Sequence, residues 1–196
     1  MSDVPDMPPG ADRAVRELTR RLPTAFWAFH EQYYRTYKGY AELMLGDPHA
    51  ASRLVHRVMM DLAVNWNRLM QEESPGATAW AILKISVAQE LDARDSEPAL
   101  TEIAAFRRAL LDPYREKFAA LESGLGLYAA IARLPERQYD VIVLQYVLQL
   151  PPHRVASIMG VRLTTVRSHR RMARAKLARD LGLVINPDHD DEDESL

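Results

Sequence analysis

The sequence predicts an all-α protein made of two small helical bundles joined by a partly helical linker. Apolar residues recur at spacings of three and four along most of the chain, which is the period of an amphipathic helix. Glycine, proline and capping residues divide these periodic segments into pieces of helix length. The most continuous apolar run, residues 141–150, is framed by helix-starting prolines, so no segment favours a strand.

Length and composition limit the classes of function. A chain of 196 residues can hold one large domain or two small ones that each bury a core. It contains no cysteine, which excludes disulfides, thiolate metal sites and cysteine nucleophiles. No apolar run is long enough to span a bilayer, and residues 1–12 are polar and acidic, unlike a signal peptide. We therefore expect a cytoplasmic protein with no membrane contact.

The N-terminal half predicts a three-helix bundle behind a short extension. Its first helix carries seven aromatic residues, several at spacings of three and four, so one face would be aromatic and buried. A ligand-binding role for this stripe is the less favoured alternative. Asp47, between Gly46 and Pro48, is the candidate cap of the second helix, and a Ser-Pro-Gly turn precedes the third. We assign the extension to residues 1–24, the helices to 26–45, 49–70 and 79–91, the turn to 74–76 and the bundle to 25–95.

A polar stretch with a proline separates this bundle from a linker. The linker is amphipathic in two pieces, so we expect it to be helical rather than a flexible spacer. The C-terminal domain then begins with two helices that would pack beneath a helix pair, and a like-charge run after Pro187 predicts a disordered tail. We assign the boundary to residues 92–98, the linker to 96–126 with helices at 99–111 and 113–121, the C-terminal domain to 127–183 with helices at 127–134 and 135 to about 147, and the tail to 184–196.

Residues 150–182 are typical of a helix-turn-helix. Pro151 and Pro152 suit the first turn of a helix, where a missing N–H costs nothing. An apolar face follows, and Gly160 then offers the positive φ that ends many helices. A second, strongly basic helix starts with Thr164 or Thr165 as its candidate cap. Two short helices around a glycine turn predict a helix-turn-helix; the alternative is a basic surface helix in an ordinary bundle.

Charge is distributed unevenly along the chain, whose net charge is −2. Residues 125–182 hold ten Arg and Lys against three acidic residues, a net charge of +7, whereas the tail from residue 183 carries −6. A phosphate-binding surface requires such a concentration of positive charge. The tail is either a solvated solubility segment or, in the sharper hypothesis, a segment whose residues 188–194 fold back on the basic helices and compete with DNA.

The basic helix provides the candidates for DNA contact. Side chains early in the second helix would reach base edges, here Arg167, Ser168, Arg171 and Thr164, while the other basic residues would hold phosphates. The helix itself thus indicates Thr164, Arg167, Ser168, Arg170, Arg171 and Arg174 as DNA-binding candidates.

With both halves assigned, the chain resembles the extracytoplasmic-function sigma factors, small promoter-specificity subunits of bacterial RNA polymerase. The resemblance covers residues 25–91 (region 2 of the family) and 127–181 (region 4). It implies that the helix-turn-helix reads the minus-35 promoter element, and that the partners are double-stranded promoter DNA, core RNA polymerase and an anti-sigma or other regulatory protein. The region 4 pattern is carried by Leu134-Pro135-Glu136-Arg137, Val141, Leu144, Tyr146-Val147, Leu150, Val155-Ala156, Met159-Gly160-Val161, Thr165-Val166-Arg167-Ser168, Ala173-Arg174 and Leu177.

Within region 4 the chain departs from the family at four positions. Arg170 stands where the family has an apolar residue. Either its charged end extends to the solvent while its stem stays on the apolar face, or the helix is rotated. His153 and Arg154 replace an acidic pair, which favours phosphate proximity, and Arg162 replaces a capping serine. The resemblance therefore adds Arg154, Arg162 and the matched Thr165 to the DNA-binding candidates.

Region 2 departs further. The family presents an acidic face to a basic coiled coil of the polymerase, whereas that surface here is largely basic, and like charges across an interface repel. The family's minus-10-reading helix is rich in Arg and Asn, but residues 82–92 are nearly free of positive charge. The candidates for binding polymerase or another partner are Asp47, Ser52, Arg53, His56 and Arg57.

Two functions follow. The favoured one is an atypical sigma factor; the alternative is a sigma-like DNA-binding regulator whose N-terminal bundle serves dimerisation or a protein partner. An enzyme is disfavoured, because the six histidines lack metal-ligand spacing and no phosphate loop or nucleophile motif is present. We expect no cofactor and no metal.

Overall fold

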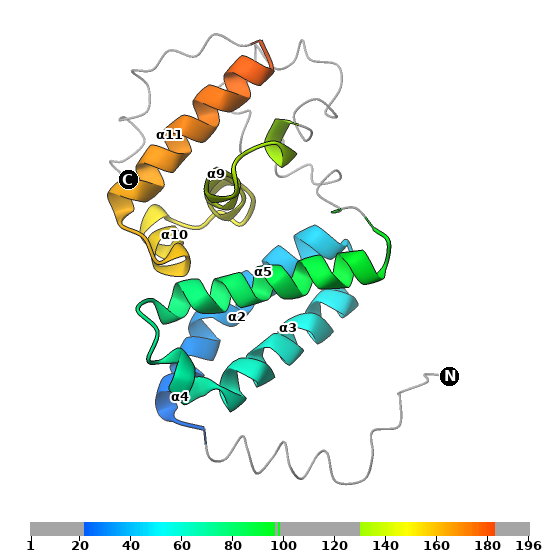
Figure 1. The fold of residues 1–196 in the computed structure, drawn as a ribbon, viewed down its shortest axis with the longest axis vertical. Coiled ribbons are helices and arrows are strands. Elements are labelled where there is room, and N and C mark those ends of the chain that lie inside the picture. Colours follow the sequence, from blue (N-terminus) through cyan, green and yellow to red (C-terminus); the bar gives the residue numbers. More distant parts are fainter. Residues whose placement is uncertain (1–21, 97, 99–129, 183–196) are drawn as a thin grey trace.

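The structure of the chain is a computed structural model, shown in Figure 1, which describes residues 22–96, 98 and 130–182. These residues form eight helical segments, besides a short helical turn at residues 130–132, and no strand, which confirms the all-α prediction. Among the same residues, no helix has both the length and the apolar character needed to cross a membrane. The predicted linker helices, the acidic tail and nearly all of the N-terminal extension lie outside the described residues.

The first bundle begins with a long helix that ends as the sequence predicts. Gly46 takes a left-handed conformation, with φ 65°, and its N–H donates to the Glu42 carbonyl at 2.9 Å. Asp47 then caps the next helix, its carboxylate accepting from the N–H groups of His49 (2.8 Å) and Ala50 (3.1 Å). These bonds, that from Ala50 first, hold the pKa of Asp47 below its usual range. The bundle consists of α2 (Thr24–Leu45), α3 (Pro48–Val64), the single turn α4 (Trp66–Leu69) and α5 (Pro75–Ala93).

The aromatic stripe of α2 is core, as predicted. Tyr37 and Tyr40 are buried, and their rings lie 5.9 and 4.7 Å from the ring of Trp80 on α5, within the range of favourable aromatic contacts. Burial raises the pKa of both phenols. Trp27 is the exception among the aromatic residues, with 42% of its surface exposed.

Two predicted boundaries in this bundle are wrong. The second helix does not run unbroken over residues 49–70, because Asn65 interrupts it. The Asn65 side chain donates to the Asp61 carbonyl at 2.9 Å, and such local bonding competes with the helix. The predicted turn at residues 74–76 is shorter than expected, because Pro75 is already the first residue of α5, where its missing N–H is tolerated.

The C-terminal half contains a helical turn at residues 130–132 and four further segments. The helix predicted from residue 135 to about 147 is present, but its second part is a π-helix, in which the Leu148 N–H donates to the Val143 carbonyl at 3.0 Å. Gln149 then turns the chain with φ 52°. The segments are α9 (Glu136–Ile142), the π-helix η3 (Val143–Val147), α10 (Pro152–Met159) and α11 (Leu163–Asp180).

The two halves pack directly against each other, with α10 on α5 (Figure 1). One buried apolar cluster extends from Leu83 and Tyr37 in the first half to Leu144 and Ile158 in the second, and none of these four side chains is more than 1% exposed. A second, smaller cluster that includes Leu177 supports α11 from beneath. The position of α11 therefore depends on its packing against α9 and α10, and α10 in turn packs on α5 of the first half.

Candidate nucleic-acid interface

The turn between α10 and α11 is built on Gly160. Its φ of 61° is the left-handed conformation predicted for this glycine, and its N–H donates to the Ala156 carbonyl. A second constraint acts at the same position, since a Cβ here would overlap the side chains of Ser74 and Ala77. Gly160 thus serves both the turn and the contact between the two halves.

The second helix begins earlier than predicted. Leu163 is its first residue and Arg162 its N-cap, so neither Thr164 nor Thr165 caps it, and no side chain makes a capping hydrogen bond there. Both threonines instead lie in the first turn of α11. Thr164 is exposed and Thr165 is half-buried.

The faces of α11 are clearly separated. Val166, Ala173 and Leu177 are buried against the rest of the domain. Thr164, Arg167 and Arg171 are exposed, and their spacing of three and four places them on one side of the helix. Of the other predicted contacts, Arg162 is exposed, while Thr165, Ser168, Arg170 and Arg174 are half-buried.

Arg154 makes a contact with the first bundle. Its guanidinium donates to the Gln32 carbonyl of α2 at 2.8 Å, so this side chain joins α10 to the first bundle. Its role in DNA binding stays a prediction, but the structure assigns it an intramolecular contact that the sequence pattern did not indicate. Arg137 is comparable, since it donates to the Met159 carbonyl at the end of α10 at 3.4 Å and thereby fixes α10 to α9.

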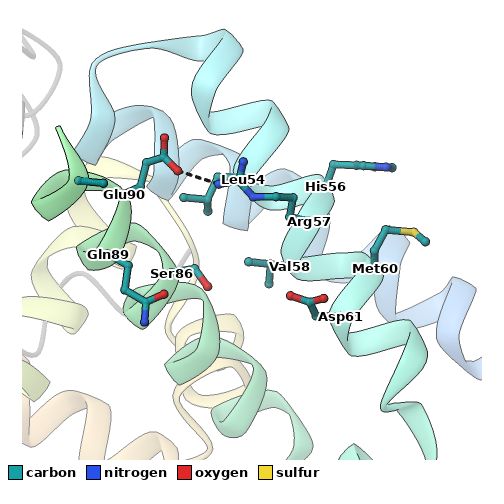
Figure 2. A pocket seen from close by; sticks show the side chains of 10 residues that line it. Leu54, His56, Arg57, Val58, Met60, Asp61, Ser86, Gln89 and Glu90 are labelled. Carbon is teal, nitrogen blue, oxygen red and sulfur yellow. Dashed lines mark hydrogen bonds and ion pairs between the residues drawn. The ribbon is translucent and has the colours of Figure 1, made fainter. Parts of the chain in front are cut away.

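The predicted partner-binding residues lie on α3 or at its start. Asp47 is occupied in capping, Ser52 is half-buried, and Arg53 is exposed. His56 and Arg57 line a groove of about 420 Å³ between α3 and α5, shown in Figure 2.

Part of the positive charge in this groove is neutralised. Arg57 donates to one oxygen of the Glu90 carboxylate at 2.7 Å (Figure 2). Arg94 donates to the other oxygen of the same carboxylate, also at 2.7 Å. The bonds from Arg94 and Arg57 hold the pKa of Glu90 below its ordinary value. The surface is therefore less cationic than the sequence pattern of α3 indicates, and its role in binding a partner stays a prediction.

One polar cluster was missed altogether by sequence reasoning. Lys84 of α5 reaches across to Asp140 and Glu136 of α9, and the Trp80 indole also donates to Asp140. Asp140 directly precedes an apolar run, but this placement does not distinguish it from any solvent-facing acid at a helix edge.

Taken together, a short helix, a glycine turn and an exposed cationic helix define a helix-turn-helix domain of the DNA-binding class. Residues 125–177 match the protein family described as Sigma-70, region 4, a DNA-binding and non-enzymatic domain of sigma factors. The C-terminal domain is therefore sigma-factor-like, and the matched range does not include the first bundle. No curated protein matches the chain.

Proposed function

We propose that the chain is an extracytoplasmic-function type sigma factor. It binds core RNA polymerase in the cytoplasm and directs it to particular promoters, with α11 reading the upstream element. The observation that carries this proposal is the exposed face of Thr164, Arg167 and Arg171 within a domain that matches Sigma-70, region 4.

In this proposal the residues of α11 have two roles. Thr164, Arg167, Ser168 and Arg171 contact base edges, since they lie in the first half of the helix. Arg162, Arg170 and Arg174 contact phosphates, which gives affinity that falls with salt concentration but carries no sequence information. The surface of α3 with Arg53, His56 and Arg57 binds polymerase or an anti-sigma protein.

A second candidate function is a DNA-binding regulator that does not act through polymerase. The packing of α5 against α10 favours it, because a helix that contacts the C-terminal domain has less surface for promoter DNA. In this case the first bundle supports the helix-turn-helix or binds a protein partner.

Co-purification with core RNA polymerase followed by run-off transcription separates the two candidates. A sigma factor forms the complex and gives transcripts that depend on the promoter sequence. Duplex binding with neither complex nor transcripts would leave the regulator, and absence of salt-dependent binding to any duplex would refute both.

A further inference from the structure

A charged cluster lies at the edge of the apolar contact between the two halves. Lys84 of α5 donates to Asp140 of α9 at 2.8 Å, and Trp80 Nε1 donates to the same carboxylate oxygen at 3.3 Å. Lys84 also pairs with Glu136, the first residue of α9. Asp140 is only 2% exposed, so its charge depends on these two donors from the other half.

Such a cluster holds the two halves differently from an apolar contact. Removing a carboxylate from water is costly, and the hydrogen bonds from Lys84 and Trp80 offset that cost only while the halves are together. When the halves separate, water hydrogen-bonds to Lys84, Trp80 and Asp140 instead. The charged contact therefore fixes one arrangement of the halves while keeping the free-energy cost of separation moderate. Burial raises the pKa of Asp140 although Lys84 opposes this, in agreement with an incompletely compensated charge.

The start of α5 approaches α10 closely enough to exclude a side chain. A Cβ on Gly76 would lie 2.9 Å from the Ser157 carbonyl oxygen and 3.2 Å from the Tyr33 hydroxyl. The hydroxyl groups of Tyr33 and Ser157 are themselves 3.1 Å apart. Gly76 therefore fits only because it has no side chain. A methyl group there would press on Ser157 of the other half and on the Tyr33 hydroxyl of its own bundle.

The closed arrangement limits what α5 can reach. Because α5 is in contact with α10, and Trp80 and Lys84 bond to Asp140 of α9, this side of α5 is covered in the closed state. The Trp80 and Lys84 side of α5 is accessible only after α9 and α10 have moved away.

We propose that Lys84, Trp80 and Asp140 form a latch, which holds the chain closed and covers this side of α5 until it opens. The latch itself does not depend on the proposed function. Only the identity of what α5 would meet after opening, a promoter element, rests on that function. Two substitutions in the full-length chain open the latch by different routes: Lys84→Met removes the cation, and Gly76→Ala inserts a methyl group between the halves.

Hydroxyl-radical footprinting read by mass spectrometry reports the opening at two tryptophans of the same bundle. Trp80 is 3% exposed and faces Asp140, whereas Trp66 is 6% exposed and packs on Phe26 and Phe29. We expect Trp80 oxidation to rise severalfold in both variants while Trp66 stays at its wild-type level. Gly39→Ala is the matched control. Its methyl group also faces the other half but meets only the flexible end of Leu148, at 3.1 Å, so both tryptophans should stay unchanged.

Thermal unfolding adds a second reading, in which a raised melting temperature is the informative outcome. Alanine favours a helix over glycine, so Gly76→Ala would raise the melting temperature if nothing faced that position. With the halves closed it lowers the melting temperature. A raised melting temperature or unchanged oxidation of Trp80 would overturn the proposal. A joint rise in oxidation of Trp80 and Trp66 would overturn it as well, because it would show that α5 separates from α9 only when the first bundle itself unfolds. Duplex binding by the wild-type chain is measured separately, and its absence would count against the proposed function alone.

Discussion

Replacing Lys84 by Met tests the energetic reasoning about the buried charge. Methionine keeps the volume and apolar stem of lysine but leaves the Asp140 carboxylate with one donor, the Trp80 indole. Removing one partner of a buried ion pair costs about 3–5 kcal/mol. Lys84 is itself 17% exposed, so the lower part of that range is expected.

Protonation of Asp140 sets an upper limit on the loss of folding stability in the Lys84→Met variant. At pH 7, holding a carboxyl group protonated costs about 1.4 kcal/mol for each pH unit above its ordinary pKa of about 4, hence about 4 kcal/mol. At pH 5 the same limit is about 1.5 kcal/mol. In the variant the pKa of Asp140 rises further, so the folded chain binds a proton that the unfolded chain releases. The free energy of unfolding therefore falls as the pH rises from about 4 to 7.

Urea unfolding followed by circular dichroism at pH 5 and pH 7 measures this loss. Adding Asp140→Asn to the variant removes both charges and retains an acceptor for Trp80, so the double variant should lie within about 1 kcal/mol of wild type at both pH values. Lys38→Met, at an exposed pair with Glu42, should cost less than about 0.5 kcal/mol. A loss below about 1 kcal/mol at pH 7, or one that is no smaller at pH 5, would refute the reasoning.

Three further predictions concern DNA binding and the first bundle. Arg167→Ala and Arg171→Ala should each weaken duplex binding by about 1–3 kcal/mol and relax sequence preference, measured by fluorescence anisotropy with Arg68→Ala on α4 as the control; an equal loss on every sequence would make them phosphate contacts. Deleting residues 188–196 should tighten duplex binding more at low salt than at high salt, and equal affinity with and without them would reject a competing tail. Asp47→Ala should lower the melting temperature more than Asp47→Asn, because Asn keeps a capping oxygen. The pKa of Asp47 is lowered in the fold, so the contribution of its carboxylate to stability should disappear as acid protonates it. Equal effects of the two variants on the melting temperature would exclude the cap.

Local signals in the sequence were sufficient for most helices. Gly46, Asp47 and Gly160 have the conformations or bonds predicted for them because each depends on its immediate neighbours. The apolar periodicity likewise identified the core of α2 and the buried side of α11, since burial follows the helical repeat.

Features that depend on distant segments could not be predicted in the same way. The interruption at Asn65 comes from one side chain competing with the helix, and nothing in its apolar neighbourhood indicates it. The Arg154 contact with Gln32 and the Lys84 contact with Asp140 join residues far apart in the chain. The exposed part of the candidate interface was predictable because it lies on one short segment; its relation to the first bundle was not.

The shared core has a practical consequence for anyone who dissects this chain. Leu144 and Ile158 have no exposed surface because the first bundle helps to cover them. A fragment containing only the helix-turn-helix domain would therefore expose an apolar, aggregation-prone patch. Aggregation or weak DNA binding of such a fragment would reflect this exposed apolar surface and would not show that the intact chain lacks the activity. Point substitutions in the intact polypeptide are therefore the sounder route to assigning its roles.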